Sequence, residues 1–142
     1  MTHYPYLVIP GLAWLIAQSL KVIIDSARHK RLDIARLGSS GGMPSSHTAM
    51  VMSLTALLGS RRGIGSPEFA ISAIFSAVVM YDATGVRRAV GRQARALNHI
   101  LDDILTAQPF NEERLRELIG HTPVEVYAGA ALGIGLALLL GR

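Results

Sequence analysis

Four apolar segments separated by short polar connections dominate the chain. They cover residues 6–24, 47–58, 69–81 and 124–140. The first is long enough to span a bilayer, which takes about 20 residues, whereas the second and third are short and could equally be core helices. The last segment follows Thr122-Pro123 with Glu125 at its third position, which is typical of a capping box. The pattern predicts an all-α bundle of about four apolar helices.

Residues 82–107 follow a different pattern. Apolar and polar residues alternate there with helical spacing, which predicts an amphipathic helix in the cytosol or at the membrane surface. The apolar face holds Val86, Val90, Ala94, Leu97, Leu101 and Ile104, and the other face holds Arg88, Arg92, Arg95, Asn98 and Asp102. A short second helix is predicted over residues 112–119, with Asn111 as its cap.

The composition indicates a small integral membrane protein with one domain over residues 1–142. Half of the residues are hydrophobic and only 17% are charged, and the mean hydropathy is +0.35, which is unusual for a soluble domain of this size. The first apolar segment lacks a basic leader and a cleavage pattern, so we expect a retained helix. A soluble helical oligomer that buries the short segments is a less favoured alternative.

The net charge and the absence of cysteine limit which ligands and which kinds of site the chain can have. A net charge of +4 suits anionic lipid head groups and phosphorylated substrates. We expect no nucleic-acid binding, because no basic run is interleaved with aromatic residues. The absence of cysteine excludes disulfides, thiolate metal sites and cysteine nucleophiles.

The positions of lysine and arginine predict the orientation in the membrane. Ten lie between the first and second or the third and fourth apolar segments, and three lie on the opposite side. The positive-inside rule therefore predicts a multi-pass protein of the cell membrane whose more basic face is cytoplasmic. A face that binds phosphate would also be basic, whether it lay on the cytoplasmic or the outer side of the membrane. The ten are residues 28, 30, 31, 36, 87, 88, 92, 95, 114 and 116, and the three are 61, 62 and 142.

Two histidines stand where apolar helices are predicted to begin, on the same side of the bundle. His47 follows a run of small and hydroxyl-bearing residues that starts at Gly38, and His121 precedes the last helix. Helix N-termini favour anions, and an imidazole there could donate a proton or attack as a nucleophile. Glu125 lies one turn from His121 and could orient its imidazole or act only as a cap. For His47 the simpler alternative is a polar residue in a capped helix start.

Lys21 lies about one turn from the end of the first apolar segment. It could extend to the membrane interface, as long basic side chains often do. It could also point into a polar cavity between helices, where intramembrane ionisable groups usually lie.

Three blocks of sequence resemble the signature blocks of the divergent PAP2 family, a shortened relative of the type 2 phosphatidic acid phosphatases and vanadium haloperoxidases. The resemblance covers nearly the whole chain, from Gln18 to Gly129. The blocks are Gly41-Gly42-Met43-Pro44-Ser45-Ser46-His47, Tyr81-Asp82-Ala83-Thr84-Gly85-Val86-Arg87-Arg88 and Gly120-His121-Thr122-Pro123-Val124-Glu125-Val126.

The resemblance implies a PAP2-like helical bundle that hydrolyses a lipid phosphate through a phosphohistidine, with no metal or cofactor. His121 corresponds to the nucleophile, Glu125 to its orienting carboxylate and His47 to the general acid. The implied phosphate-binding set is Lys21, Arg36, Ser45, Ser46, Asp82, Arg87 and Arg88. The sequence departs from the broader superfamily because the Arg-Pro pair is absent and no arginine has the usual spacing before His121.

The implied substrate is a lipid such as phosphatidic acid, phosphatidylglycerol phosphate or a polyprenyl pyrophosphate. The alternative is a non-catalytic membrane protein that binds lipid phosphate head groups or scaffolds partners. Gly129, Gly133 and Gly135 make a small-residue face on the last helix. Such a face suits helix–helix contact, including a homodimer.

Overall fold

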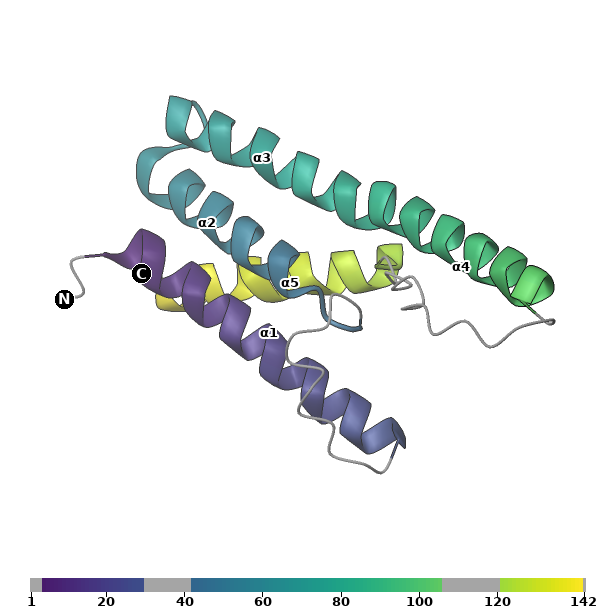
Figure 1. Cartoon of the computed structure of the whole chain (residues 1–142). Coiled ribbons are helices and arrows are strands. Elements are labelled where there is room, and N and C mark those ends of the chain that lie inside the picture. The colour runs from purple at the N-terminus through teal and green to yellow at the C-terminus, as the bar shows by residue number, and fades with distance from the viewer. Residues whose placement is uncertain (1–3, 30–41, 106–120, 142) are drawn as a thin grey trace.

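The computed structural model describes residues 4–29, 42–105 and 121–141. Five helices make up the described part, and Figure 1 shows α4 continuing the line of α3 past the end of the bundle. The helices are α1 (Pro5–His29), α2 (Ser46–Arg62), α3 (Pro67–Thr84), α4 (Val86–Leu105) and α5 (Pro123–Leu140).

The all-α prediction is confirmed, since each of the four apolar segments forms a helix. One boundary was wrong: Asp82 belongs to the last turn of α3, whereas the amphipathic helix α4 begins at Val86. The helical hydrogen bonding continues across the junction, because Gly85 N–H donates to the Tyr81 carbonyl at 2.8 Å and Ala89 N–H to the Gly85 carbonyl at 3.0 Å. The short helix predicted over residues 112–119 lies outside the described residues.

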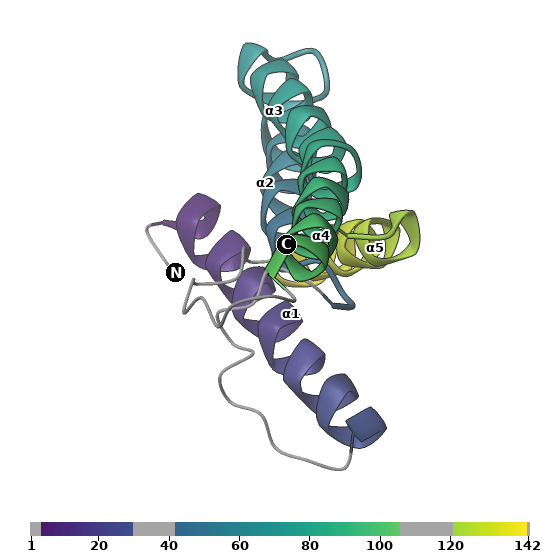
Figure 2. The ribbon, with the colours of Figure 1, turned by 45° about the vertical axis from the view of Figure 1, so that its right-hand side comes forward.

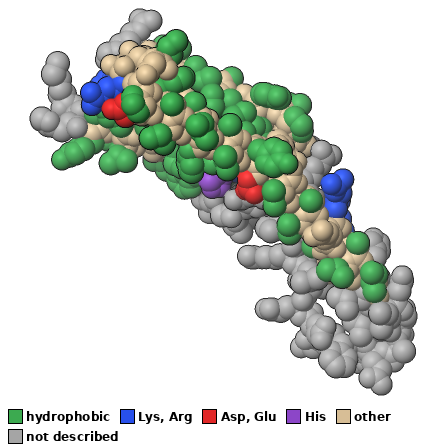
Figure 3. All heavy atoms as spheres, turned by 90° about the horizontal axis from the view of Figure 1, so that it is seen from above, with side chains coloured by type: hydrophobic (Ala, Val, Ile, Leu, Met, Phe, Trp, Pro, Cys, Tyr) green, Lys and Arg blue, Asp and Glu red, His purple; other side chains and the backbone are tan. Residues whose placement is uncertain are grey.

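In the described part of the chain, three helical stretches are long and apolar enough to cross a membrane. They are Pro5–Ala27 in α1, Pro67–Asn98 in α3 and α4, and Pro123–Leu140, which is α5. The remaining apolar helix, α2, packs against α1, α3 and α5 and is the centre of the bundle. Figure 2 shows α1 crossing the other helices at a steep angle. Figure 3 shows mainly hydrophobic side chains on one face of the described helices, as expected for a surface that contacts lipid.

Two glycines allow α5 to approach α2 closely. A Cβ at Gly129 would collide with the Ser45 carbonyl oxygen, and one at Gly133 with the Ala49 carbonyl oxygen. Both glycines are buried, whereas nothing lies near a Cβ built at Gly135. The small-residue face predicted on the last helix is therefore used within the chain, in the contact between α2 and α5.

Polar contacts join the helices inside the bundle and at one end of it. The Thr55 hydroxyl of α2 lies 2.7 Å from the Ser72 hydroxyl and 2.8 Å from the Ser76 hydroxyl of α3. At the end of α2, the Arg61 guanidinium donates to the Gly141 carbonyl at 2.9 Å and 3.1 Å. It also lies 5.9 Å from the centre of the Tyr6 ring. Arg61 thus ties the end of α2 to the end of α5 and the start of α1.

Candidate active site

The three signature blocks meet at the end of the bundle opposite Arg61. The Ser45 N–H, just before α2, donates to the Glu125 carbonyl of α5 at 3.0 Å. The His121 N–H, just before α5, donates to the Ala83 carbonyl of α3 at 3.1 Å. These two backbone hydrogen bonds fix the starts of α2 and α5 to each other and to the end of α3.

The start of α2 is shaped by its capping residues. Ser45 is the N-cap, and its hydroxyl accepts from the Thr48 N–H at 3.5 Å and lies 3.0 Å from the Thr48 hydroxyl. Gly42 has a φ of 97°, a conformation that side chains with a Cβ rarely adopt. The loop therefore turns sharply into the helix and brings His47 into its first turn.

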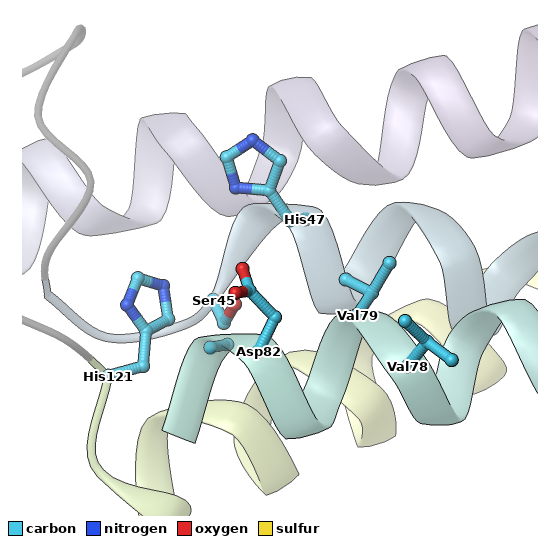
Figure 4. Close-up of a pocket in the computed structure, with 7 residues that line it drawn as sticks. Ser45, His47, Val78, Val79, Asp82 and His121 are labelled. Carbon is cyan, nitrogen blue, oxygen red and sulfur yellow. The ribbon is translucent and has the colours of Figure 1, made fainter. Parts of the chain in front are cut away.

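One cavity of about 260 Å³ lies where the blocks meet. Its polar lining is Ser45, His47, Asp82 and His121, and its apolar lining is Val78, Val79 and Ala83. Figure 4 shows the Asp82 side chain pointing toward the space between the two imidazoles, with Val78 and Val79 farther along α3. The cavity is thus polar at one end and apolar at the other.

The two histidines differ in exposure. His121 is 3% exposed, whereas His47 lies on the surface. Because each stands at or beside the N-terminus of a helix, the positive ends of the α2 and α5 dipoles are directed toward the cavity. Such a site favours an anion, with one buried imidazole and one that is open to solvent.

Lys21 lies on the inner face of α1. Its side chain is 2% exposed, and Ala13 and Ala17 are buried on the same face at four-residue spacing. Its Cγ lies 3.2 Å from the position that a Cβ would take on Gly42. The structure therefore turns Lys21 inward, beneath the loop that precedes α2. The carboxylates of Glu125 and, more weakly, Asp25 act on its charge.

Glu125 forms the capping box that the sequence suggests. Its Oε2 accepts from the Thr122 N–H at 2.8 Å, and its own N–H donates to the Thr122 hydroxyl at 3.4 Å. It is not among the residues that line the cavity. The orienting role that we expected for Glu125 stays a prediction, and Asp82 is the carboxylate that borders both histidines.

Of the other predicted phosphate ligands, one lies away from the cavity and the arginines fall outside what the structure describes. Ser46 is buried in the first turn of α2 and does not line the cavity. Arg36 lies outside the described residues, and the side chains of Arg87 and Arg88 also lie outside them. Sequence reasoning missed the apolar wall of Val78, Val79 and Ala83. The spacing of Val78 and Asp82, four residues apart on one helix face, was the available signal.

In the described part of the chain, no group of three or more His, Asp or Glu side chains could hold a metal ion. The polar groups around the cavity instead suit an oxyanion such as phosphate, because helix N-termini and imidazoles present N–H donors.

The described part of the chain is an all-α bundle whose three membrane-length helical stretches are those of an integral membrane protein. It has a cavity lined by two histidines at one end. The chain belongs to the Divergent PAP2 family, whose sequence profile matches residues 2–136. It is 40% identical to the uncharacterized membrane protein YuiD of Bacillus subtilis (strain 168), over 99% of this chain and 95% of that protein. No solved structure matches this chain.

Proposed function

We propose that the protein is an integral membrane phosphatase that hydrolyses a lipid phosphate monoester through a phosphohistidine. The observation that supports this most is the cavity, which brings His47 and His121 together from opposite halves of the sequence. An amphiphilic cavity suits an amphiphilic substrate, with the phosphate at the histidines and the lipid portion beside Val78 and Val79. Phosphatidic acid, phosphatidylglycerol phosphate and polyprenyl pyrophosphate are substrates of this kind.

In the proposed reaction a nitrogen of His121 attacks phosphorus, and the bond from phosphorus to the lipid oxygen breaks. His47 in its protonated form gives a proton to that oxygen, so the lipid of a phosphate monoester leaves as an alcohol. With a polyprenyl pyrophosphate, the bridging oxygen takes the proton and polyprenyl phosphate leaves. Water, deprotonated by His47, then attacks the phosphohistidine and releases inorganic phosphate. The donors at the start of α2 and the Lys21 ammonium would stabilise the charge on the phosphoryl oxygens.

Asp82 is a second candidate for the carboxylate that orients a histidine. It stands in the last turn of α3 and lines the cavity together with His47 and His121, where its negative charge raises the cost of burying the carboxylate. An imidazolium in the cavity would offset that cost. Comparison of Asp82→Asn with Glu125→Gln separates the two candidates, since loss of the orienting partner lowers phosphate release and loss of a cap lowers mainly stability.

Phosphate release from a panel of lipid phosphates in mixed micelles tests the proposal. We expect His121→Ala to abolish release and the acid-labile phosphate on the protein, and His47→Ala to slow release by about 10²- to 10⁴-fold, as for loss of a general acid. His3→Ala, which removes a histidine before the first helix, is the matched control. Undiminished release by folded His121→Ala would exclude the proposed nucleophile.

The second candidate function is a non-catalytic receptor for lipid phosphate head groups. The burial of the Lys21 ammonium beneath the loop supports it equally, since binding needs charge but no nucleophile. Vanadate or phosphate binding without release from any lipid on the panel would favour this function. The cytoplasmic position of the site also stays a proposal. So does a homodimer through the last helix, which would have to use Gly135, because Gly129 and Gly133 pack against α2.

A further inference from the structure

The helix formed by α3 and α4 is too long to lie wholly within a bilayer. The stretch Pro67–Asn98 alone has 32 residues, or about 48 Å at 1.5 Å per residue. A hydrocarbon core is about 30 Å thick, and about 20 residues cross it. Counted from Pro67, the crossing ends near Val86, where α4 begins. The arginines at 87, 88, 92 and 95 fit a segment outside the hydrocarbon.

The projecting helix α4 carries a row of exposed apolar side chains, which we call the α4 stripe. It consists of Val86, Val90, Leu97 and Ile100, each between 40% and 53% exposed. Among the described helices, α4 contacts only α3. The stripe therefore presents large apolar groups beyond the bilayer without cover from another described helix.

The spacing of the α4 stripe is that of a coiled-coil seam. The steps from Val86 to Val90, Gln93, Leu97 and Ile100 are four, three, four and three residues. This is the alternation of the two core positions of a heptad, with the polar Gln93 at one of them. Arg92 and Arg95 are exposed and fall on the outer positions of that heptad.

We propose that the α4 stripe is the contact between two copies of this chain, joined as a parallel coiled coil. Two copies inserted in the same direction in one membrane hold their α4 helices parallel, so a twofold axis along the membrane normal brings each stripe residue opposite itself. Cover by the bilayer surface instead would require a bend at Gly85. The hydrogen bonds from Gly85 to Tyr81 and from Ala89 to Gly85 keep the helix continuous there.

The contact begins close to the cavity. Asp82, Val86 and Val90 follow one another at four-residue spacing, so they lie on one face of the continuous helix. A dimer through the α4 stripe would therefore place the two cavities beside the same axis. This inference is independent of phosphatase activity, because it rests on the length, exposure and spacing of α4.

The absence of cysteine allows a direct test, since a disulfide between two copies of a single-cysteine variant can join only the same residue of each copy. Full-length Leu97→Cys and Arg95→Cys proteins, in native membranes, are oxidised and separated without reductant. We expect Leu97→Cys to become mostly disulfide-linked dimer and Arg95→Cys to stay monomeric, with Val90→Cys behaving like Leu97→Cys. Val90 and Leu97 are 40% and 49% exposed, so we expect both cysteine variants to fold.

Equal cross-linking of Leu97→Cys and Arg95→Cys would indicate random collision and overturn the proposal. Failure of both Leu97→Cys and Val90→Cys to cross-link would also overturn it, and would leave the bilayer surface or another protein as the cover. The membranes can also be diluted with excess lipid before oxidation. A stable pair is expected to give undiminished cross-linking of Leu97→Cys under that condition.

Discussion

At the scale of single residues, the buried Lys21 says most about what the site could bind. Its side chain is 2% exposed, and a buried ammonium is costly and is usually kept for a partner or a ligand. Glu125 and Asp25 supply negative charge near it, and the Glu125 carboxylate also caps α5. The place of Lys21 beneath Gly42, next to the start of α2, suits a cation that also attracts a bound phosphate.

Replacement of Lys21 by methionine should weaken the binding of a phosphate analogue while preserving the volume of the side chain. A lost charge-assisted contact of about 1.5–3 kcal/mol corresponds to about 10- to 150-fold in affinity. Vanadate titration by calorimetry measures the change, and thermal unfolding in the same detergent measures stability. Gln18→Met, a substitution of similar shape one turn away, is the control.

Unchanged vanadate affinity in Lys21→Met would contradict the phosphate-binding role of Lys21. If stability falls and affinity does not, the lysine serves only to neutralise Glu125 and Asp25 within the fold.

At the scale of helices, the contact between α2 and α5 connects stability with the site. Gly133→Ala should lower the free energy of unfolding by about 1–3 kcal/mol, because overpacking forces the helices apart. The atom that the new methyl group would meet is the backbone oxygen of Ala49, which cannot rotate away as a side chain can. Gly135→Ala is the matched control, since the added methyl group meets open space.

Thermal unfolding followed by circular dichroism checks this prediction. Gly135→Ala should be neutral or more stable by up to about 1 kcal/mol, from the better helix propensity of alanine. Equal melting of the two variants would mean that α2 and α5 do not touch at Gly133. Gly129→Ala should in addition weaken vanadate binding, since its methyl group would meet the Ser45 carbonyl beside the cavity.

The apolar pattern was sufficient to predict the helices but not how they face one another. Each apolar segment forms a helix, and the capping box of Thr122 and Glu125 was read correctly. The boundary at Asp82 was wrong because a change from apolar to amphipathic composition does not require the backbone to break. Gly85 stays within the helical hydrogen bonds, and composition carries no sign of that.

The site was predictable only in part, for a related reason. The motifs around His47 and His121 marked both histidines, and the cavity contains both. The direction of Lys21 stayed open because α1 is apolar on most sides, so its sequence does not reveal which face packs inward. The wall of Val78 and Val79 was missed because apolar residues in an apolar helix stand out only by their spacing from a polar residue, here Asp82 four residues after Val78.

At the scale of the whole molecule, the helix ends divide the bundle into two poles. The starts of α2 and α5 and the end of α3 form the pole with the cavity, with Lys21 at the same level on α1. The end of α2, the end of α5 and the start of α1 form the other pole, held together by Arg61. A single orientation in the membrane therefore fixes the side on which the cavity opens.

Cysteine labelling in a chain that has no cysteine of its own tests the proposed cytoplasmic position of the cavity. Met43→Cys marks the pole with the cavity, and Ile64→Cys marks the opposite pole, in the connection between α2 and α3. Both positions are exposed, at 37% and 79%. The excess of arginine and lysine at the cavity pole should keep it inside. We therefore expect an impermeant maleimide to label Ile64→Cys in intact cells and Met43→Cys only after permeabilisation. The reverse pattern would place the cavity outside and would attribute its basic surroundings to phosphate binding instead of membrane insertion.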